Sequence, residues 1–181
     1  MPPSLIINLF GVSTAGKSTI ATLLQSHIDR LYLVDFDVVK KQLTGYEWNR
    51  DSQIAQQITF DTLVSAVRAQ LPILALLPLP EDEATYSHLA QLAMSHNYAL
   101  MNIEMTAPDS VLIERYQHRL TQAKQLHPDW KYKTLSEFES KLKQPHFRPA
   151  DTITFNSSQQ SPQTIIGELL PRLRPYKLLR E

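Results

Sequence analysis

The segment from residue 11 to residue 18, which reads GVSTAGKS, constrains this chain more than any other part of the sequence. It matches the pattern G-x-x-x-x-G-K-[ST] in full, with an apolar run at 5–10 before it and an amphipathic run at 17–27 after it. The chain has only four glycines, and two of them, Gly11 and Gly16, lie in this segment. A strand that turns sharply into a helix needs the backbone freedom of glycine. The segment therefore predicts a strand, a tight loop and a helix.

A loop of this kind is suited to holding phosphate groups. Its glycines allow successive backbone N–H groups to point inward, and the following helix adds the positive end of its dipole. Lys17 can reach the β- and γ-phosphates, and the Ser18 hydroxyl can bind Mg²⁺. A chance match in a turn is the alternative, but the flanking runs favour the functional reading. The candidate nucleotide-contacting residues of the loop are Gly11, Val12, Ser13, Thr14, Ala15, Gly16, Lys17, Ser18 and Thr19.

The rest of the chain alternates short apolar runs with longer amphipathic ones. Strands are predicted at 5–10, 31–34, 73–77, 98–105 and 151–155, and helices at 17–27, 38–43, 52–70, 81–95, 109–126, 136–142 and 162–173. The tail from 174 to 181 shows no clear order. This alternation predicts an α/β fold with a mostly parallel sheet and helices on both of its faces.

Composition excludes several classes of protein. A length of 181 residues fits one domain, and 18 basic residues balance 18 acidic ones, which argues against a protein that coats nucleic acid or anionic membranes. The absence of cysteine rules out disulfides, thiolate nucleophiles and zinc–thiolate sites. There is no signal-peptide pattern and no apolar run of 18 residues, so the expected location is the cytoplasm.

Two carboxylates, Asp35 and Asp37, follow the second predicted strand. Ligands bind outside the carboxyl ends of strands in open parallel sheets, and alternate residues of an extended segment face the same way. Both side chains are therefore expected to face one site. There, Asp37 would position a hydroxyl group and accept its proton, and Asp35 would hold the metal. The alternative is that one Asp caps the following helix.

Other patterns narrow the reaction further. The strings D-x-x-G and N-K-x-D, which a GTPase needs, do not occur. The third predicted strand ends at Pro78, where many phosphate-loop proteins place a metal-binding Asp. Asp35 or Glu104 could replace that residue, or its absence could reflect lost activity. Arg50 is a candidate reader of an anionic acceptor, whereas the lysines at 131, 133, 141 and 143 are interpreted as a solvated face, and the histidines show no metal-ligand spacing.

Four stretches together resemble the small P-loop kinases that phosphorylate hydroxyl groups. This group includes shikimate and gluconate kinases, chloramphenicol phosphotransferase and the polynucleotide-kinase-like proteins of the AAA_33 family. The stretches are the phosphate loop, the segment 35–40 (DFDVVK), the segment 106–108 (TAP) leading into 114–119 (ERYQHR), and the segment 150–158 (ADTITFNSS).

The resemblance implies a P-loop NTPase three-layer fold over residues 1–181, with a five-stranded parallel sheet of order 2-3-1-4-5 and a helical lid at about 115–148. It implies ATP with Mg²⁺ as phosphate donor, Asp37 as catalytic base, and Ser18 and Asp35 as metal ligands. The segment 150–158, which contains Ser157, would be the adenine loop.

Arg115 and Arg119 match the lid arginines of the family. They lie four residues apart on one helix face, so they could clamp the transferring phosphoryl group. Arg115 could instead lie over the adenine, and both could also form weak surface pairs. Lys40 stands where the polynucleotide-kinase branch has an arginine, which weakens the case for a polynucleotide acceptor.

The sequence thus predicts an ATP-dependent kinase that phosphorylates a hydroxyl group of a small molecule. Lys17, Asp35, Asp37 and Arg119 are its expected catalytic residues. A regulatory protein that binds ATP without transferring phosphate, and a kinase acting on nucleic-acid 5′-hydroxyl groups, are the alternatives. The identity of the acceptor cannot be read from the residues.

Overall fold

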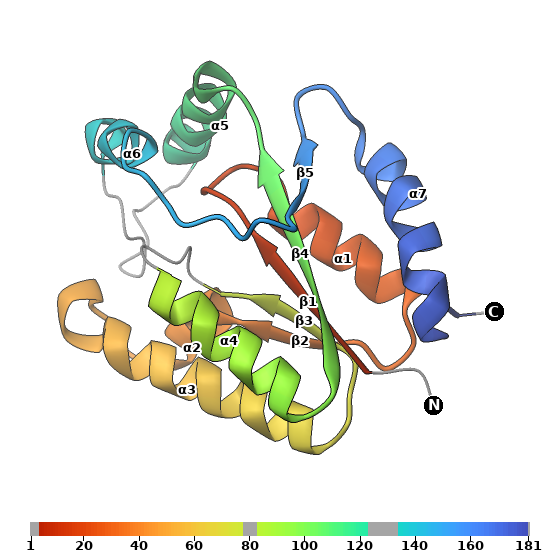
Figure 1. Cartoon of the computed structure of the whole chain (residues 1–181). Helices are drawn as coiled ribbons and strands as arrows, with labels where there is room; N and C mark the ends of the chain where they lie inside the picture. The colour runs from red at the N-terminus through yellow and green to blue at the C-terminus, as the bar shows by residue number, and fades with distance from the viewer. Residues whose placement is uncertain (1–3, 78–82, 123–133, 181) are drawn as a thin grey trace.

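A computed structural model describes residues 4–77, 83–122 and 134–180 (Figure 1). The strands are β1 (Ser4–Phe10), β2 (Tyr32–Asp35), β3 (Ile73–Leu76), β4 (Tyr98–Thr106) and β5 (Ile153–Asn156). The helices are α1 (Lys17–His27), α2 (Phe36–Gln42), α3 (Trp48–Arg68), α4 (Glu83–Ser95), α5 (Asp109–Gln122), α6 (Leu135–Leu142) and α7 (Pro162–Leu173), followed by a 3₁₀ turn, η1 (Arg174–Tyr176). No helix in these described residues is long and apolar enough to cross a membrane.

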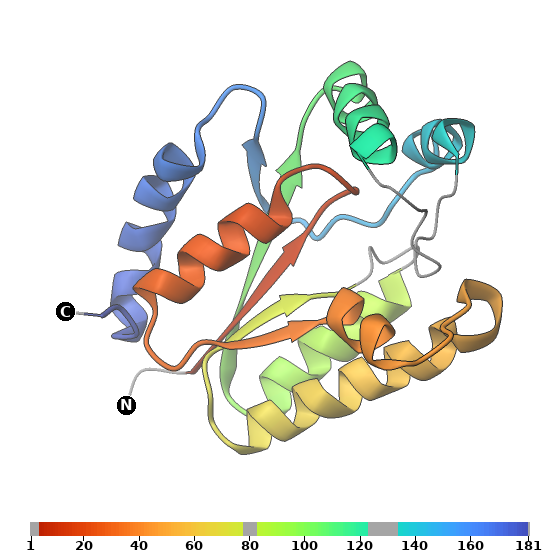
Figure 2. The ribbon, with the colours of Figure 1, turned by 180° about the vertical axis from the view of Figure 1, so that it is seen from behind.

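The five strands form one parallel sheet in the order β2-β3-β1-β4-β5, which confirms the expected topology. Helices α1 and α7 cover one face, and α3 and α4 cover the other (Figures 1 and 2). The sheet is therefore buried on both sides, which explains why β1 and β3 are almost wholly apolar.

Each face of the sheet has its own apolar core. Ile7 and Leu9 of β1 point to the α1 and α7 side, where they pack with residues such as Leu24. The preceding residue, Ile6, points to the other side and belongs to a cluster with Leu63 of α3. This alternation follows from the two-residue period of a strand.

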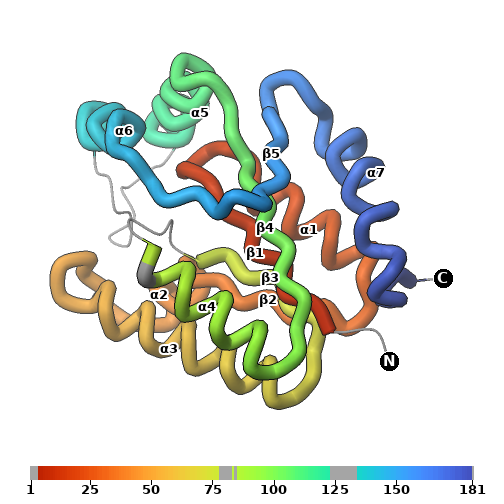
Figure 3. Tube along the Cα trace, viewed as in Figure 1, coloured from red at the N-terminus to blue at the C-terminus, as the bar shows by residue number. Residues whose placement is uncertain are grey.

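The carboxyl ends of the strands meet at one edge of the sheet. Helices α5 and α6 stand beyond this edge, and the chain then returns across the sheet to β5 (Figure 3). The two helices contact each other through Tyr116 and Phe138, whose rings are stacked with centroids 4.1 Å apart. Both rings are buried and belong to the same apolar core as Ile7 and Leu9, so α5 and α6 are joined to the main body of the fold.

Several boundaries differ from the predicted ones. Helix α3 begins at Trp48 rather than at 52, because the Asp51 carboxylate in its first turn accepts a hydrogen bond from the Glu47 N–H. The expectation of a tail without order is wrong, since η1 forms there and Leu179 pairs with Ile28 in an antiparallel bridge. The predicted helix segments at 81–82 and 123–126 lie outside the described residues.

Candidate functional site

The loop between β1 and α1 has the strained backbone that its glycines predict. Gly11 has φ +135°, and a Cβ atom there would lie 2.2 Å from the Met105 carbonyl oxygen. Gly16 has φ +95° and occupies the position just before α1, without a side-chain cap on the helix. Only glycine fits at position 11, because β4 runs directly against the loop. The N-terminus of α1 is left open toward the cavity described below.

Lys17 curls back over this loop. Its ammonium donates hydrogen bonds to the carbonyl oxygens of Gly11, at 2.8 Å, and Val12, at 2.9 Å. Burial lowers the pKa of Lys17 to about 8, although the negative charges of Asp37 and Asp35 act in the opposite direction. The nearby Arg119 lowers it further. Because nearby charges already shift the pKa of Lys17, a bound phosphate, which is also negative, is expected to raise it.

A cavity of about 360 Å³ lies beside the loop. It brings together the sequence-predicted Lys17, Ser18, Asp35, Asp37 and Arg119, which come from three separate stretches of the chain. Its described lining comprises Gly11, Ser13, Thr14, Gly16, Lys17, Ser18, Thr19, Asp35, Phe36, Asp37, Lys40, Trp48, Leu76, Leu77, Tyr116, Arg119 and Lys141.

Lys141 is a cavity residue that the sequence analysis missed. Its interpretation as part of a solvated face is wrong, because Lys141 lies in the last turn of α6 and lines the cavity. The three-residue spacing puts Phe138 and Lys141 on one face of α6, but only the structure, in which Phe138 is buried, shows that this face points inward.

Asp35 and Asp37 both line the cavity, but their backbone conformation differs from the expected one. Asp35 ends β2 and its Oδ1 accepts a hydrogen bond from the Asp37 backbone N–H at 2.8 Å, so it caps α2. Asp37 already belongs to that helix, so the expectation of one extended segment is wrong. Burial raises the pKa of the Asp35 carboxyl above its ordinary value, against the effect of this hydrogen bond.

Asp37 is paired with a buried cation on its own helix. Lys40 Nζ lies 2.7 Å from Asp37 Oδ1. The same ammonium lies 5.3 Å from the ring centroid of Phe36 and 5.9 Å from those of Tyr46 and Trp48. Three aromatic faces therefore surround the cation and attract it. Lys40 fixes the position of the carboxylate at the mouth of the cavity.

Arg115 and Arg119 point into different cavities. Arg115 donates to the Thr14 carbonyl oxygen and to the hydroxyl and carbonyl oxygens of Ser157, at 2.9–3.3 Å. It lines a second cavity of about 350 Å³, together with Thr14, Gly16, Thr19, Ile20, Met105, Ser157, Gln160, Pro162 and Ile165. Arg115 thus ties the phosphate loop to the loop after β5, whereas Arg119 lines the first cavity.

Two weaker candidates are engaged elsewhere. Both carboxylate oxygens of Glu104 have protein partners, which are described below. Arg50 forms a double hydrogen bond with Asp51 and donates to the Gly45 carbonyl oxygen. At the end of β3, the cavity is lined by Leu76 and Leu77 rather than by a carboxylate.

A parallel sheet of this order, with a phosphate loop after β1 and paired helices beyond the strand ends, defines a small P-loop kinase fold. The chain belongs to the AAA_33 family, described as an AAA domain, whose sequence profile matches residues 6–145. No curated protein matches the chain in the corresponding comparison.

Solved structures share this fold across nearly the whole chain. A protein of Chloroflexus aurantiacus J-10-fl described as a candidate kinase has a TM-score of 0.76 at 16% identity, with 94% of this chain and 98% of that chain covered. A gluconokinase of Sinorhizobium meliloti 1021 has a TM-score of 0.59 at 16% identity, covering 96% and 93%. The tunicamycin resistance protein of Deinococcus radiodurans has a TM-score of 0.59 at 17% identity, covering 94% and 95%.

Proposed function

We propose that this protein is an ATP-dependent kinase that phosphorylates a hydroxyl group of a small molecule. The observation that carries the proposal is the shared cavity, in which the phosphate-loop Lys17 and the Asp37 carboxylate line the same space. A cation that holds a phosphate and a carboxylate that receives a proton are the two groups that phosphoryl transfer to an alcohol requires.

The residues present fit a nucleotide. Helix α1 has no side-chain cap and no acidic residue in its first turn, so its N-terminal N–H groups remain suited to an anion. The triphosphate would lie along residues 11–18, and the base would enter the second cavity beside Arg115 and Ser157. The nucleotide would then extend from the second cavity into the first, with its γ-phosphate toward Asp37.

The residues also fit Mg²⁺ delivered with the nucleotide. Ser18 and Asp35 offer oxygen ligands from one wall of the cavity. Among the described residues, no three His, Cys, Asp or Glu side chains gather as a metal cage. Mg²⁺ in such enzymes is held by a few protein oxygens, the phosphates and water, and it would offset phosphate charge there.

In the reaction, Asp37 would orient the acceptor hydroxyl and accept its proton. The hydroxyl oxygen forms a bond to the γ-phosphorus as the bond to the bridging oxygen of ADP breaks. Lys17 and Arg119 would stabilise the charge on the transferring group, and Lys141 adds a third cation to the lining of the same cavity.

The cavity favours a small acceptor. Its size is that of a small-molecule site, and Trp48 and Leu77 contribute apolar surface to its lining. Lys40, which stands where the polynucleotide-kinase branch has an arginine, is buried among rings and paired with Asp37 rather than presented to a strand of nucleic acid.

The second candidate function is ATP binding without phosphate transfer. It is favoured by the absence of a carboxylate at the described end of β3, where Leu76 and Leu77 line the cavity. Such a protein would bind Mg-ATP through the same loop and would release ADP at the same low rate whatever acceptor is present.

The deciding experiment measures ADP release from Mg-ATP with pooled acceptors: sugars, sugar acids, nucleosides, aminoalcohols, antibiotics and 5′-hydroxyl oligonucleotides. Lys17→Ala is the control for contaminating ATPase activity. A pool that raises ADP release in the wild type alone supports the kinase. Confirmed ATP binding with no response in any pool supports the second function, and a response confined to oligonucleotides overturns the small-molecule acceptor.

A further inference from the structure

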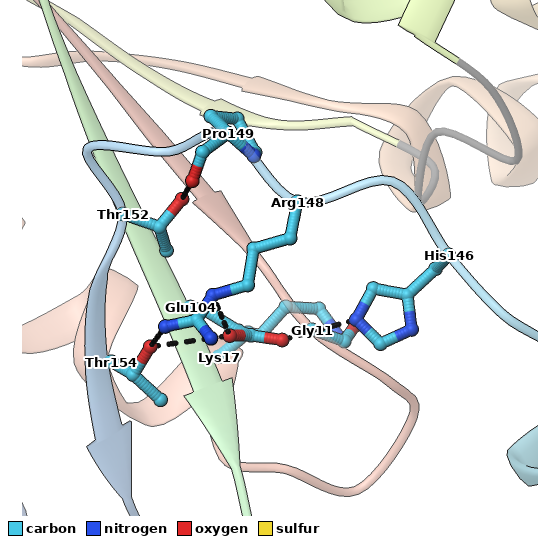
Figure 4. A network of polar contacts seen from close by, with 8 residues as sticks. All are labelled: Gly11, Lys17, Glu104, His146, Arg148, Pro149, Thr152 and Thr154. Carbon is cyan, nitrogen blue, oxygen red and sulfur yellow. Dashed lines mark hydrogen bonds and ion pairs between the residues drawn. The ribbon is translucent and has the colours of Figure 1, made fainter.

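Glu104 of β4 is a buried carboxylate whose two oxygens are fully engaged (Figure 4). Oε1 lies 3.1 Å from His146 Nε2. Oε2 accepts a hydrogen bond from the Thr154 hydroxyl at 3.2 Å and lies 3.1 Å from Arg148 Nε. Arg148 also donates to the Thr154 hydroxyl, which closes the network. A carboxylate this buried requires such partners to offset its lost hydration.

The partners of Glu104 come from the segment that follows α6. We call residues 143–152 the strap, because they carry the chain from the end of α6 back across β4 to β5 (Figures 1 and 4). His146 and Arg148 are four and six residues beyond Leu142, the last residue of α6. Any displacement of His146 is therefore transmitted to α6 through only three intervening residues.

Glu104 also lies just before the point where the chain leaves the sheet to form α5 and α6. It is two residues before Thr106, where β4 ends and the chain leaves for α5. It is paired in register with Phe10, the residue that precedes the phosphate loop. Glu104 thus joins the outgoing strand to the returning strap at the base of α5 and α6.

Several polar contacts hold the strap to the sheet. Besides the contacts to Glu104, the Asp151 carboxylate accepts a hydrogen bond from the Asn102 side chain at 3.0 Å. Asn102 and Glu104 are two residues apart on β4 and share one face of the sheet. Phe147 adds a ring contact to Tyr86 of α4, with centroids 5.4 Å apart. Packing of the buried Pro149 therefore acts together with directional contacts, and among these the contacts to Glu104 include its ion pair with Arg148.

We infer that Glu104 is a positioning residue: by clasping the strap, it fixes where α6 stands and thereby where Lys141 meets the phosphate cavity. The stacked rings of Tyr116 and Phe138 extend this effect to α5, which carries Arg119. Glu104 itself acts at a distance, through His146 and Arg148. The kinetic part of this inference rests on the proposed kinase function, whereas the structural part does not.

A distance measurement tests the structural part. The chain has no cysteine, so spin labels at Ser140→Cys on α6 and Gln56→Cys on α3, both exposed positions, report on α6 relative to the sheet. In the variant Glu104→Gln, we expect the label-to-label distance distribution to broaden or shift. Asp151→Asn is the matched control, since it makes the same carboxylate-to-amide change at the other end of the strap contacts.

An unchanged distribution in Glu104→Gln overturns the inference. An equal change in Asp151→Asn also overturns it, because the position of the strap would then not depend on Glu104 in particular. Arg148→Gln should reproduce the effect of Glu104→Gln, and the double variant should add little beyond either single one.

Kinetics test the second part once an acceptor is known. In Glu104→Gln we expect kcat to fall roughly tenfold or more, because small misplacements of charge-stabilising groups are costly. The affinity for ADP should stay near the wild-type value, since the phosphate loop is not altered. A merely structural role predicts a lower thermal midpoint with kcat unchanged. If no acceptor is found, the kinase proposal fails and the distance measurement still decides on the clasp.

Discussion

Lys40 Nζ lies 2.7 Å from Asp37 Oδ1, although the lysine side chain is only 7% exposed and the aspartate is 68% exposed. A buried cation thus holds a carboxylate that remains open to the cavity. This asymmetry suits a group that must be fixed in position and still reach a substrate. It also means that a change at Asp37 alters the environment of a buried charge.

The first prediction separates these two effects. Asp37→Asn should abolish acceptor phosphorylation, and it should also lower the free energy of unfolding by about 1 kcal/mol or more, because the ammonium loses a charged partner. In Asp37→Asn/Lys40→Met, the apolar side chain should restore stability among the three rings but not activity. Denaturant titration and acceptor assays on both variants check this. Restored activity in the double variant would contradict the role of Asp37 as base.

The second prediction concerns pH and Lys17. Its pKa of about 8 lies below the ordinary 10.5, so free protein carries a neutral Lys17 above about pH 8. Bound phosphates favour the ammonium, so binding above this pH must take up a proton and the affinity for Mg-ADP should fall as pH rises. Below pH 8 the lysine is already charged and the affinity should level off.

Calorimetric titration in two buffers of different ionisation enthalpy measures this proton directly. Proton uptake should be small near pH 7 and approach about one at pH 9. Uptake that stays flat across this range would show that Lys17 does not titrate there, and the proposed link between its burial and nucleotide binding would be lost.

The third prediction is a matched pair of glycine substitutions. Gly11→Ala places a Cβ atom 2.2 Å from the Met105 carbonyl oxygen at a φ of +135°, so we expect a loss of roughly 2–4 kcal/mol in the free energy of unfolding. Gly167→Ala, within α7 and with nothing within 4 Å of its added Cβ, should instead gain roughly 0.5–1 kcal/mol. Chemical denaturation of both variants provides the test, and similar effects would contradict the close approach of β4 to the loop.

The fourth prediction distinguishes the two arginines of α5. Arg115→Met should weaken Mg-ADP binding about tenfold, because the loop after β5 is no longer tied to the phosphate loop. Arg119→Met should leave Mg-ADP binding nearly unchanged and lower kcat, because Arg119 lines the cavity that receives the γ-phosphate. Equal losses of ADP affinity in both variants would show that the two side chains do not have separate tasks.

Much of this architecture could be predicted from the residues because local signals agreed with it. The phosphate loop fixed one strand and one helix, the apolar runs located the remaining strands, and α7 matched its predicted bounds, Pro162–Leu173. The strand order came from family resemblance rather than from periodicity. Parallel strands of similar composition carry little information on which neighbour they pair with.

What the sequence did not show depends on contacts between distant segments. The inward direction of Lys141 follows from the Phe138 ring stacking on Tyr116 more than twenty residues earlier. Two partners of Glu104, His146 and Arg148, lie on a strap without regular structure, so no helical or strand period reveals them. For Asp35 the sequence offered a metal ligand or a helix cap as alternatives, and the structure shows that it lines the cavity and also caps α2 through the Asp37 N–H.

The stacked rings of Tyr116 and Phe138 have a consequence for how the cavity could close. The stacked rings hold α5 and α6 together. The two helices would therefore move as one unit, and Arg119 and Lys141 would move with them at the same time. A state with only one of these cations next to the phosphate would then be little populated. Binding of a triphosphate would shift the protein between two states, one open and one closed. Weakening the contact between the Tyr116 and Phe138 rings would let α5 and α6 move separately, so that intermediate positions become populated.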